Sequence, residues 1–134
     1  MERKKELIIK TPDGKVENRY TVEWPTVQNI IDIESLKLML SKGKYTEMIL
    51  SGTKWMERTL NYIDMCAYLT VLCPGLVKDM KVDIRNLDAI DANGGLLKVY
   101  QEQFLPWWNK YEQMVNKHET QEKTVVEDDK GGAK

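Results

Sequence analysis

The sequence has little of the residue types that carry most enzyme and metal chemistry. It holds one histidine, His118, and two cysteines, Cys66 and Cys73, in 134 residues. Neither cysteine belongs to a Cys-x-x-Cys pair or a Cys–His cluster, so we expect no zinc site. A Gly-x-Ser-x-Gly elbow and a spaced-glycine phosphate loop are also absent. We therefore expect a protein that is not an enzyme and that needs no metal and no cofactor.

Long apolar runs are missing as well. No run approaches the about 20 residues that a membrane-spanning helix needs, and residues 1–10 lack the apolar core of a secretory signal. The formal net charge of −1 provides no general attraction to nucleic acid or to an anionic membrane. These absences predict a protein that stays inside a cell or in a particle assembled there.

The two cysteines are expected to be free. Cys66 and Cys73 fall in one predicted helix, where a rise of ~1.5 Å per residue separates their Cα atoms by about 10 Å. A disulfide requires a Cα separation below ~7 Å. We expect both to be reduced, buried and small apolar residues of the core.

One group of carboxylates allows two interpretations. Asp83, Asp88 and Asp91 are close in sequence, and such residues can bind a divalent cation or form an acid–base pair. They can equally be exposed carboxylates near a helix N-terminus, where the helix dipole favours negative charge. We favour the second interpretation because nothing else in the sequence supplies the rest of an active site.

The N-terminal part of the chain predicts a β-hairpin over residues 6–24. Residues 12–15, Pro-Asp-Gly-Lys, form a turn sequence in which proline presets φ and glycine accepts a positive φ. In the following segment Val16, Tyr20, Val22 and Trp24 alternate onto one face, with Asn18 as the exception. This alternation is typical of a half-buried strand.

A helix is predicted to follow at once. Pro25 ends the second strand because it cannot donate to a strand ladder, and Thr26 is a suitable N-cap for a helix over residues 27–42. Apolar residues occur on more than one side of this helix, among them Ile31 and Leu38. A helix that is apolar this widely is central in the fold or contacts a partner. The sequence leaves both alternatives open.

The remainder of the chain also has helical patterns. We expect a helix over 45–50 and a long helix over 54–73, which Thr53 caps and Pro74-Gly75 ends. A short segment at 76–81 follows, and then a short helix that Asp83 or Asn86 caps and that ends at 93–95. A last helix is expected over 96–117, with a kink at Pro106. The stripe of the long helix is expected to comprise Trp55, Met56, Leu60, Ile63, Ala67, Thr70 and Val71. The polar segment 118–134 is expected to be a flexible tail.

These patterns together predict one fold. It is α+β and mainly α, with an N-terminal β-hairpin followed by a bundle of four to five helices. Residues 1–117 form a single domain, in which 6–24 are the hairpin and 26–117 the helical body.

Aromatic residues gather near the end of the helical body, at Phe104, Trp107 and Trp108. Adjacent residues on a helix point about 100° apart, so one tryptophan is expected inside and the other near the surface. The alternative is that the hairpin or the kinked helix covers both. Tryptophan is enriched at binding hot spots. The candidate partner-binding residues are therefore Trp107, Trp108, Phe104, Ile31, Leu38 and Trp24.

The layout resembles the small tail assembly chaperones of tailed bacteriophages, in the Mu-like group. The resemblance rests on the hairpin, on the Pro25-Thr26-Val27 step with Asp32 shortly after it, and on the segment Leu87-Asp88-Ala89-Ile90-Asp91. It covers roughly residues 6–100. The long helix over 54–73 and the Pro106-Trp107-Trp108 end do not match the family pattern, which leaves room for another phage role.

The resemblance implies a non-enzymatic function. Members of this family keep the tape-measure protein soluble and help tail-tube subunits assemble along it, so the expected partners are tape-measure or other virion proteins. The expected location is the host cytoplasm or the virion, with an oligomer in the assembly. The alternatives are a structural virion subunit of the head, neck or tail, and a small nucleic-acid-associated or regulatory protein, in which the tryptophans would stack on single-stranded bases.

Overall fold

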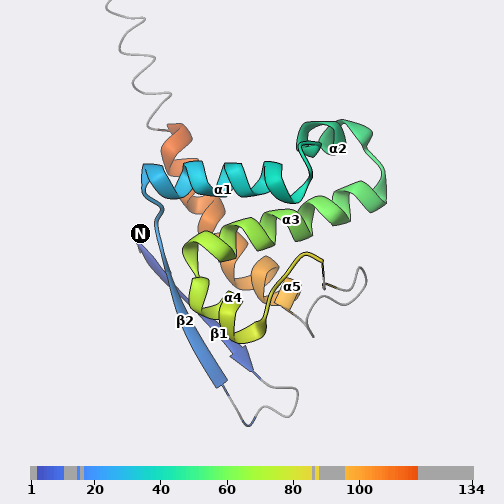
Figure 1. The fold of residues 1–134 in the computed structure, drawn as a ribbon. Helices are drawn as coiled ribbons and strands as arrows, with labels where there is room; N and C mark the ends of the chain where they lie inside the picture. Colours follow the sequence, from blue (N-terminus) through green and yellow to red (C-terminus); the bar gives the residue numbers. More distant parts are fainter. Residues whose placement is uncertain (1–2, 11–14, 16, 86, 88–95, 118–134) are drawn as a thin grey trace, which may run out of the picture.

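The fold is an antiparallel two-stranded hairpin followed by helices, as the sequence predicts (Figure 1). A computed structural model describes residues 3–10, 15, 17–85, 87 and 96–117. The elements are β1 (Lys4–Lys10), β2 (Glu17–Glu23), α1 (Val27–Leu40), α2 (Tyr45–Ser51), α3 (Lys54–Leu72), α4 (Pro74–Met80), α5 (Leu96–Val99) and η2 (Tyr100–Phe104). A further helical stretch over 105–117 continues η2. The predicted fold class, α+β and mainly α, is confirmed.

The hairpin packs one face on the helices and leaves the other in solvent. Leu7 pairs with Tyr20 across the ladder, and Leu7 and Val22 are fully buried. On the outer face Arg19 donates hydrogen bonds to Glu6 and Glu17. Asn18, the polar exception on the otherwise apolar face, is exposed, and Val16 lies outside the described residues. The hairpin is thus an amphipathic cover for one side of the helical body.

Capping residues define the helix starts that the sequence predicts. The Thr26 side chain accepts from the Asn29 backbone N–H, and the Asn29 side chain accepts from the Thr26 backbone N–H. At α3 the Thr53 side chain accepts from the Met56 backbone N–H. These bonds pair donors that a helix start otherwise leaves free. The end of α1 comes earlier than predicted, at Leu40, because Lys42 and Gly43 both adopt positive φ.

Helix α3 runs through the centre of the molecule. It contacts α1, α2 and α4, and in Figure 1 the C-terminal helical segment crosses behind it. Its second half is buried on nearly every side, at Tyr62, Ile63, Met65, Cys66, Ala67, Tyr68 and Leu69. The predicted stripe is therefore partly wrong: Ile63 and Ala67 are buried, but Trp55 is 58% exposed and Thr70 is exposed. Trp55 lies in the first turn of α3, beyond the part that other elements surround.

The predicted helix break at Pro74 is confirmed. Helix α3 ends at Leu72, and α4 begins at Pro74 itself rather than at residue 76. Proline suits the first turn of a helix because its missing N–H has no intrahelical acceptor there. Cys66 and Cys73 are both free and buried, as expected.

The last helical segment contains a π-helical turn just before Pro106. The backbone N–H of Leu105 bonds the carbonyl of Tyr100, five residues earlier. A proline ring clashes with the preceding turn of a regular α-helix, and the wider π turn lies where that clash would occur. The predicted disturbance at Pro106 is thus present as a change of helix type in η2.

The helix expected to end at 93–95 lies outside the described residues apart from Asp83–Arg85 and Leu87. The tail over 118–134 also lies outside them, so both the tail and the domain boundary at 117 stay predictions.

Candidate functional site

The six candidate partner-binding residues divide into a buried group and an exposed group. Phe104, Trp107 and Trp108 are buried, at 0%, 7% and 4% exposure. Trp24 is half-buried. Ile31 and Leu38 are each 53% exposed. The candidates therefore do not form one site, and only the two α1 residues remain available to a partner.

The expectation that one of the two adjacent tryptophans lies near the surface is wrong. Both belong to a cluster of rings that fills the space between α3 and the C-terminal segment. Trp108 lies 4.8 Å from Tyr68 and 5.7 Å from Phe104, measured between ring centroids, and Phe104 lies 5.8 Å from Trp107. The Trp108 indole N–H also donates to Glu112 at 2.8 Å. The second alternative, in which both rings are covered, is the one observed.

Trp24 joins the end of the hairpin to the C-terminal helix. Its ring lies 5.3 Å from that of Tyr111, and the Arg3 guanidinium lies 5.2 Å from its centroid. Its indole N–H is buried and meets no protein acceptor within the described residues. These contacts make Trp24 a packing residue rather than a free binding residue.

Helix α1 has apolar residues on two sides, one buried in the fold and the other exposed. Ile33 and Lys37 lie on the buried side, facing α3. Val27, Ile31 and Leu38 are exposed, and their spacing of four and seven residues places them on one side of the helix. We call these three residues the outer α1 stripe. The apolar excess of α1 therefore belongs to the core on one side and to the exposed surface on the other.

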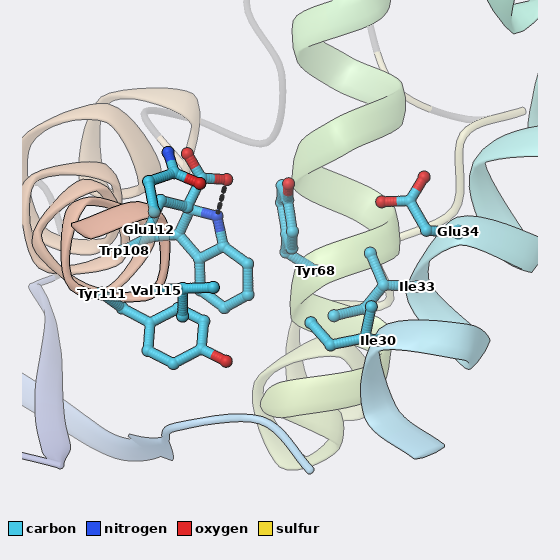
Figure 2. A pocket seen from close by; sticks show the side chains of 9 residues that line it. Ile30, Ile33, Glu34, Tyr68, Trp108, Tyr111, Glu112 and Val115 are labelled. Carbon is cyan, nitrogen blue, oxygen red and sulfur yellow. Dashed lines mark hydrogen bonds between the residues drawn. The ribbon is translucent and has the colours of Figure 1, made fainter. Parts of the chain in front are cut away.

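A cleft of about 440 Å³ lies between α1, α3 and the helix over 105–117. Figure 2 shows its two sides: Trp108, Tyr111, Glu112 and Val115 lie opposite Ile30, Ile33 and Glu34, with Tyr68 between them. The lining residues are Ile30, Ile33, Glu34, Tyr68, Trp108, Tyr111, Glu112, Val115 and Asn116. Apolar and aromatic side chains dominate this set, with carboxylates on both sides.

A polar network lies beside the cleft. Lys37, only 7% exposed, donates to the Tyr68 hydroxyl at 3.1 Å and to Glu34 at 3.3 Å. Tyr45 donates to Asp64. Burial by itself lowers the pKa of Lys37, but the hydrogen bond to Tyr68 and the carboxylates of Asp64 and Glu34 outweigh it, so this pKa is raised. The network therefore holds Lys37 as a cation.

At Asp64 the effect of burial on the pKa outweighs the effects of the neighbouring groups. Burial raises its pKa above the usual 3.8, although the hydrogen bond from Tyr45 and the charge of Lys37 act in the other direction. Burial likewise raises the pKa of Tyr68 and of Tyr45. These tyrosines remain neutral hydrogen-bonding groups, and Lys37 has no lowered pKa that would make it a nucleophile.

The carboxylate group considered in the sequence is only partly described. Asp83 accepts hydrogen bonds from the Arg85 side chain and backbone, which lower the pKa of Asp83 to about 2. Asp88 and Asp91 lie outside the described residues. Within the described part of the chain, no three His, Cys, Asp or Glu side chains are grouped to hold a metal ion. The structure thus assigns Asp83 to a local turn.

Sequence reasoning missed the cleft and the Lys37 network. One signal was present: Lys37 follows Ile30 and Ile33 at helical spacing, so it shares their buried side. A lysine on such a side requires polar partners. Its hydrogen-bond partner Tyr68 and the nearby carboxylate of Asp64 come from α3, and their proximity depends on how α1 packs, which no local pattern gives.

The chain matches no known family model, and no curated protein or solved structure matches it significantly. Among the described residues no single helix is long and apolar enough to cross a membrane. Only α3 and α4 pass that test as a pair, and they are bent by 116° at the break between them. The candidate site therefore rests on geometry alone.

Proposed function

We propose that this protein is a non-enzymatic phage assembly protein that binds other tail or virion proteins, in the manner of a tail assembly chaperone. The observation that carries the proposal is the outer α1 stripe, Val27, Ile31 and Leu38, which is exposed on a well-capped helix. Several exposed large apolar side chains on one side of a helix favour contact with another protein. An amphipathic helix or groove is a common way to hold apolar segments of another protein.

The resemblance to tail assembly chaperones supports the same region. Its Pro25-Thr26-Val27 step is the point where the chain leaves the hairpin and enters α1. Val27 is both the last residue of that step and the first residue of the outer α1 stripe. The motif and the exposed surface therefore belong to one structural feature.

A structural virion subunit is the second candidate. One observation favours it: Ile49 and Leu50 on α2 are also exposed, as is Trp55 at the start of α3. A subunit of a ring or a tube makes heterologous contacts, which use two different surfaces of each subunit. The nucleic-acid alternative loses its argument because Trp107 and Trp108 are buried and cannot stack on bases.

The test compares the free protein, its partner complex and purified particles. We expect co-expression to keep the tape-measure protein of the same genome soluble, and purified particles to lack this chain. Ile31→Asp with Leu38→Asp should abolish the solubilising effect, since a charge on the stripe opposes apolar contact. Asn61→Asp with Thr70→Asp, at exposed sites of α3, is the matched control. Stoichiometric amounts of the chain in particles would reject the chaperone role and favour the virion subunit.

A further inference from the structure

The cleft between α1, α3 and the helix over 105–117 combines three kinds of surface. Rings of Tyr68, Trp108 and Tyr111 form a continuous wall, with 4.8 Å and 5.2 Å between successive ring centroids. Ile30 and Ile33 form the opposite apolar wall, and Glu34 and Glu112 lie on opposite sides of the opening (Figure 2). No basic side chain belongs to the described lining. Its volume of about 440 Å³ is within the roughly 300–1,000 Å³ of ligand pockets.

Both carboxylates retain capacity for another donor. Glu34 accepts from Lys37, but its side chain is 61% exposed. Glu112 accepts the Trp108 indole N–H on Oε1 and is exposed. An ionised carboxylate offers about four lone-pair sites, so one bond leaves each group able to accept from a ligand. Lys37 offsets part of the charge of Glu34, with which it forms an ion pair, and Glu112 adds a second carboxylate, so the lining of the cleft opening stays acidic.

We propose that this cleft binds an arginine side chain from a segment of a partner protein. The aliphatic stem would lie between the isoleucines and the ring wall. The guanidinium would bond Glu34 and Glu112 while packing on the rings. Arginine suits this combination better than lysine because its planar group stacks on aromatic faces and donates to two carboxylates at once.

The partner is a polypeptide rather than a free small molecule because the cleft adjoins the outer α1 stripe. Glu34 comes three residues after Ile31 and four before Leu38, and residues at those spacings are neighbours on a helix surface. Apolar residues flanking the arginine would therefore cover the stripe. This inference rests on the proposed protein-binding function, and it adds the chemistry by which a partner segment is recognised.

The probe is a synthetic helical peptide made mostly of alanine. It carries a single arginine, with one leucine a turn before it and another a turn after it. Its matched peptide carries citrulline, which keeps the shape but removes the charge. Binding to the full chain is measured by fluorescence anisotropy, and the site by NMR shifts of the Trp108 indole N–H. We expect the arginine peptide to bind at least about tenfold more tightly than the citrulline peptide, and salt to weaken only the former.

Two substitutions test the carboxylates. Glu34→Gln and Glu112→Gln keep a hydrogen-bond acceptor at each position and should each weaken the arginine peptide by roughly three- to tenfold. Glu57→Gln, at an exposed site in the first turn of α3, is the control and should leave affinity unchanged. Circular dichroism and the Trp108 resonance confirm that each variant is folded.

The outcomes separate this inference from the proposed function. Equal binding of the two peptides, or unchanged affinity in both glutamine variants, would overturn the arginine site. Binding of butylguanidinium as tight as that of the peptide would also overturn it, since a small organic cation would then suffice. If the tape-measure protein still depends on Ile31 and Leu38 while Glu34→Gln and Glu112→Gln have no effect, the arginine site fails and the proposed function stands.

Discussion

Gln103 and Ile8, 95 positions apart in the chain, exchange two hydrogen bonds. The Ile8 backbone N–H donates to Gln103 Oε1 at 2.7 Å, and Gln103 Nε2 donates to the Ile8 carbonyl at 2.9 Å. The side-chain amide of η2 thereby bonds the free edge of β1 as a neighbouring strand would. The hairpin is thus attached to the helical body by polar contacts as well as by its apolar face.

Gln103→Ala should lower the free energy of unfolding by about 1–3 kcal/mol, because it leaves two half-buried backbone groups of Ile8 without partners. Urea unfolding measures the change. Gln101→Ala, at an exposed position two residues earlier, is the control and should change stability by less than about 0.5 kcal/mol. Equal effects of the two substitutions would show that the Gln103 bonds contribute nothing.

Trp108 and Trp55 lie in different environments, so replacing each of them with alanine should lower the free energy of unfolding by very different amounts. Trp108→Ala removes a ring buried among Tyr68, Phe104 and Tyr111 and should lower stability by about 3–5 kcal/mol. Trp55→Ala removes a ring that is 58% exposed and should cost less than about 1 kcal/mol. Thermal and urea unfolding measure both. If Trp55→Ala lowered the stability more than Trp108→Ala did, the exposed position of Trp55 at the start of α3 would be contradicted.

Local sequence patterns predict where helices begin and end, but not how their side chains pack. Thr26, Thr53 and Pro74 act through bonds and clashes within a few residues, so their helix boundaries could be predicted. Trp107 and Trp108 lie in the regular helical stretch over 105–117, but their prediction assumed that only one side of that helix would be covered. Packing on α3 and on neighbouring rings buries both tryptophans, and such packing is not visible in a local pattern.

The candidate site was predictable only in part, for the same reason. The excess of apolar residues on α1 was visible in the sequence, and Ile31 and Leu38 are indeed exposed. The cleft is lined by residues of three segments. Glu112 and Glu34 line the same cleft only because α1 packs beside the helix over 105–117. Periodicity contains no information on that packing.

Both cysteines should react slowly with a thiol reagent in the folded protein. Burial raises the pKa of the Cys66 thiol to about 12 and also raises that of Cys73, and the thiolate is the reactive form. At pH 8 we expect little reaction with Ellman's reagent before urea is added and two thiols per chain afterwards. Rapid reaction of one thiol in the absence of urea would place that cysteine at the surface. Cys66→Ser and Cys73→Ser identify which one reacts.

Asp64 gives a pH dependence whose sign differs from that of an ordinary ion-paired carboxylate. Its pKa is raised in the folded state, chiefly by burial, so the folded protein binds this proton more tightly than the unfolded chain does. The resulting stabilisation is fully present below the unfolded value, near 3.8, and is lost as the pH rises through the folded pKa. Asp64→Asn keeps an acceptor for Tyr45 and removes the titration.

The stability of the Asn variant relative to the wild type should therefore increase as the pH rises from 3.8 through the folded pKa of Asp64, and then stay level. Lys37 contributes no slope there because its raised pKa keeps it charged in both states. Urea unfolding of the two proteins at a series of pH values measures the difference. The control is Asp79→Asn at an exposed position of α4, which keeps an acceptor for the Tyr20 hydroxyl. A relative stability that decreases with pH would mean that Lys37 and Tyr45 outweigh burial at Asp64.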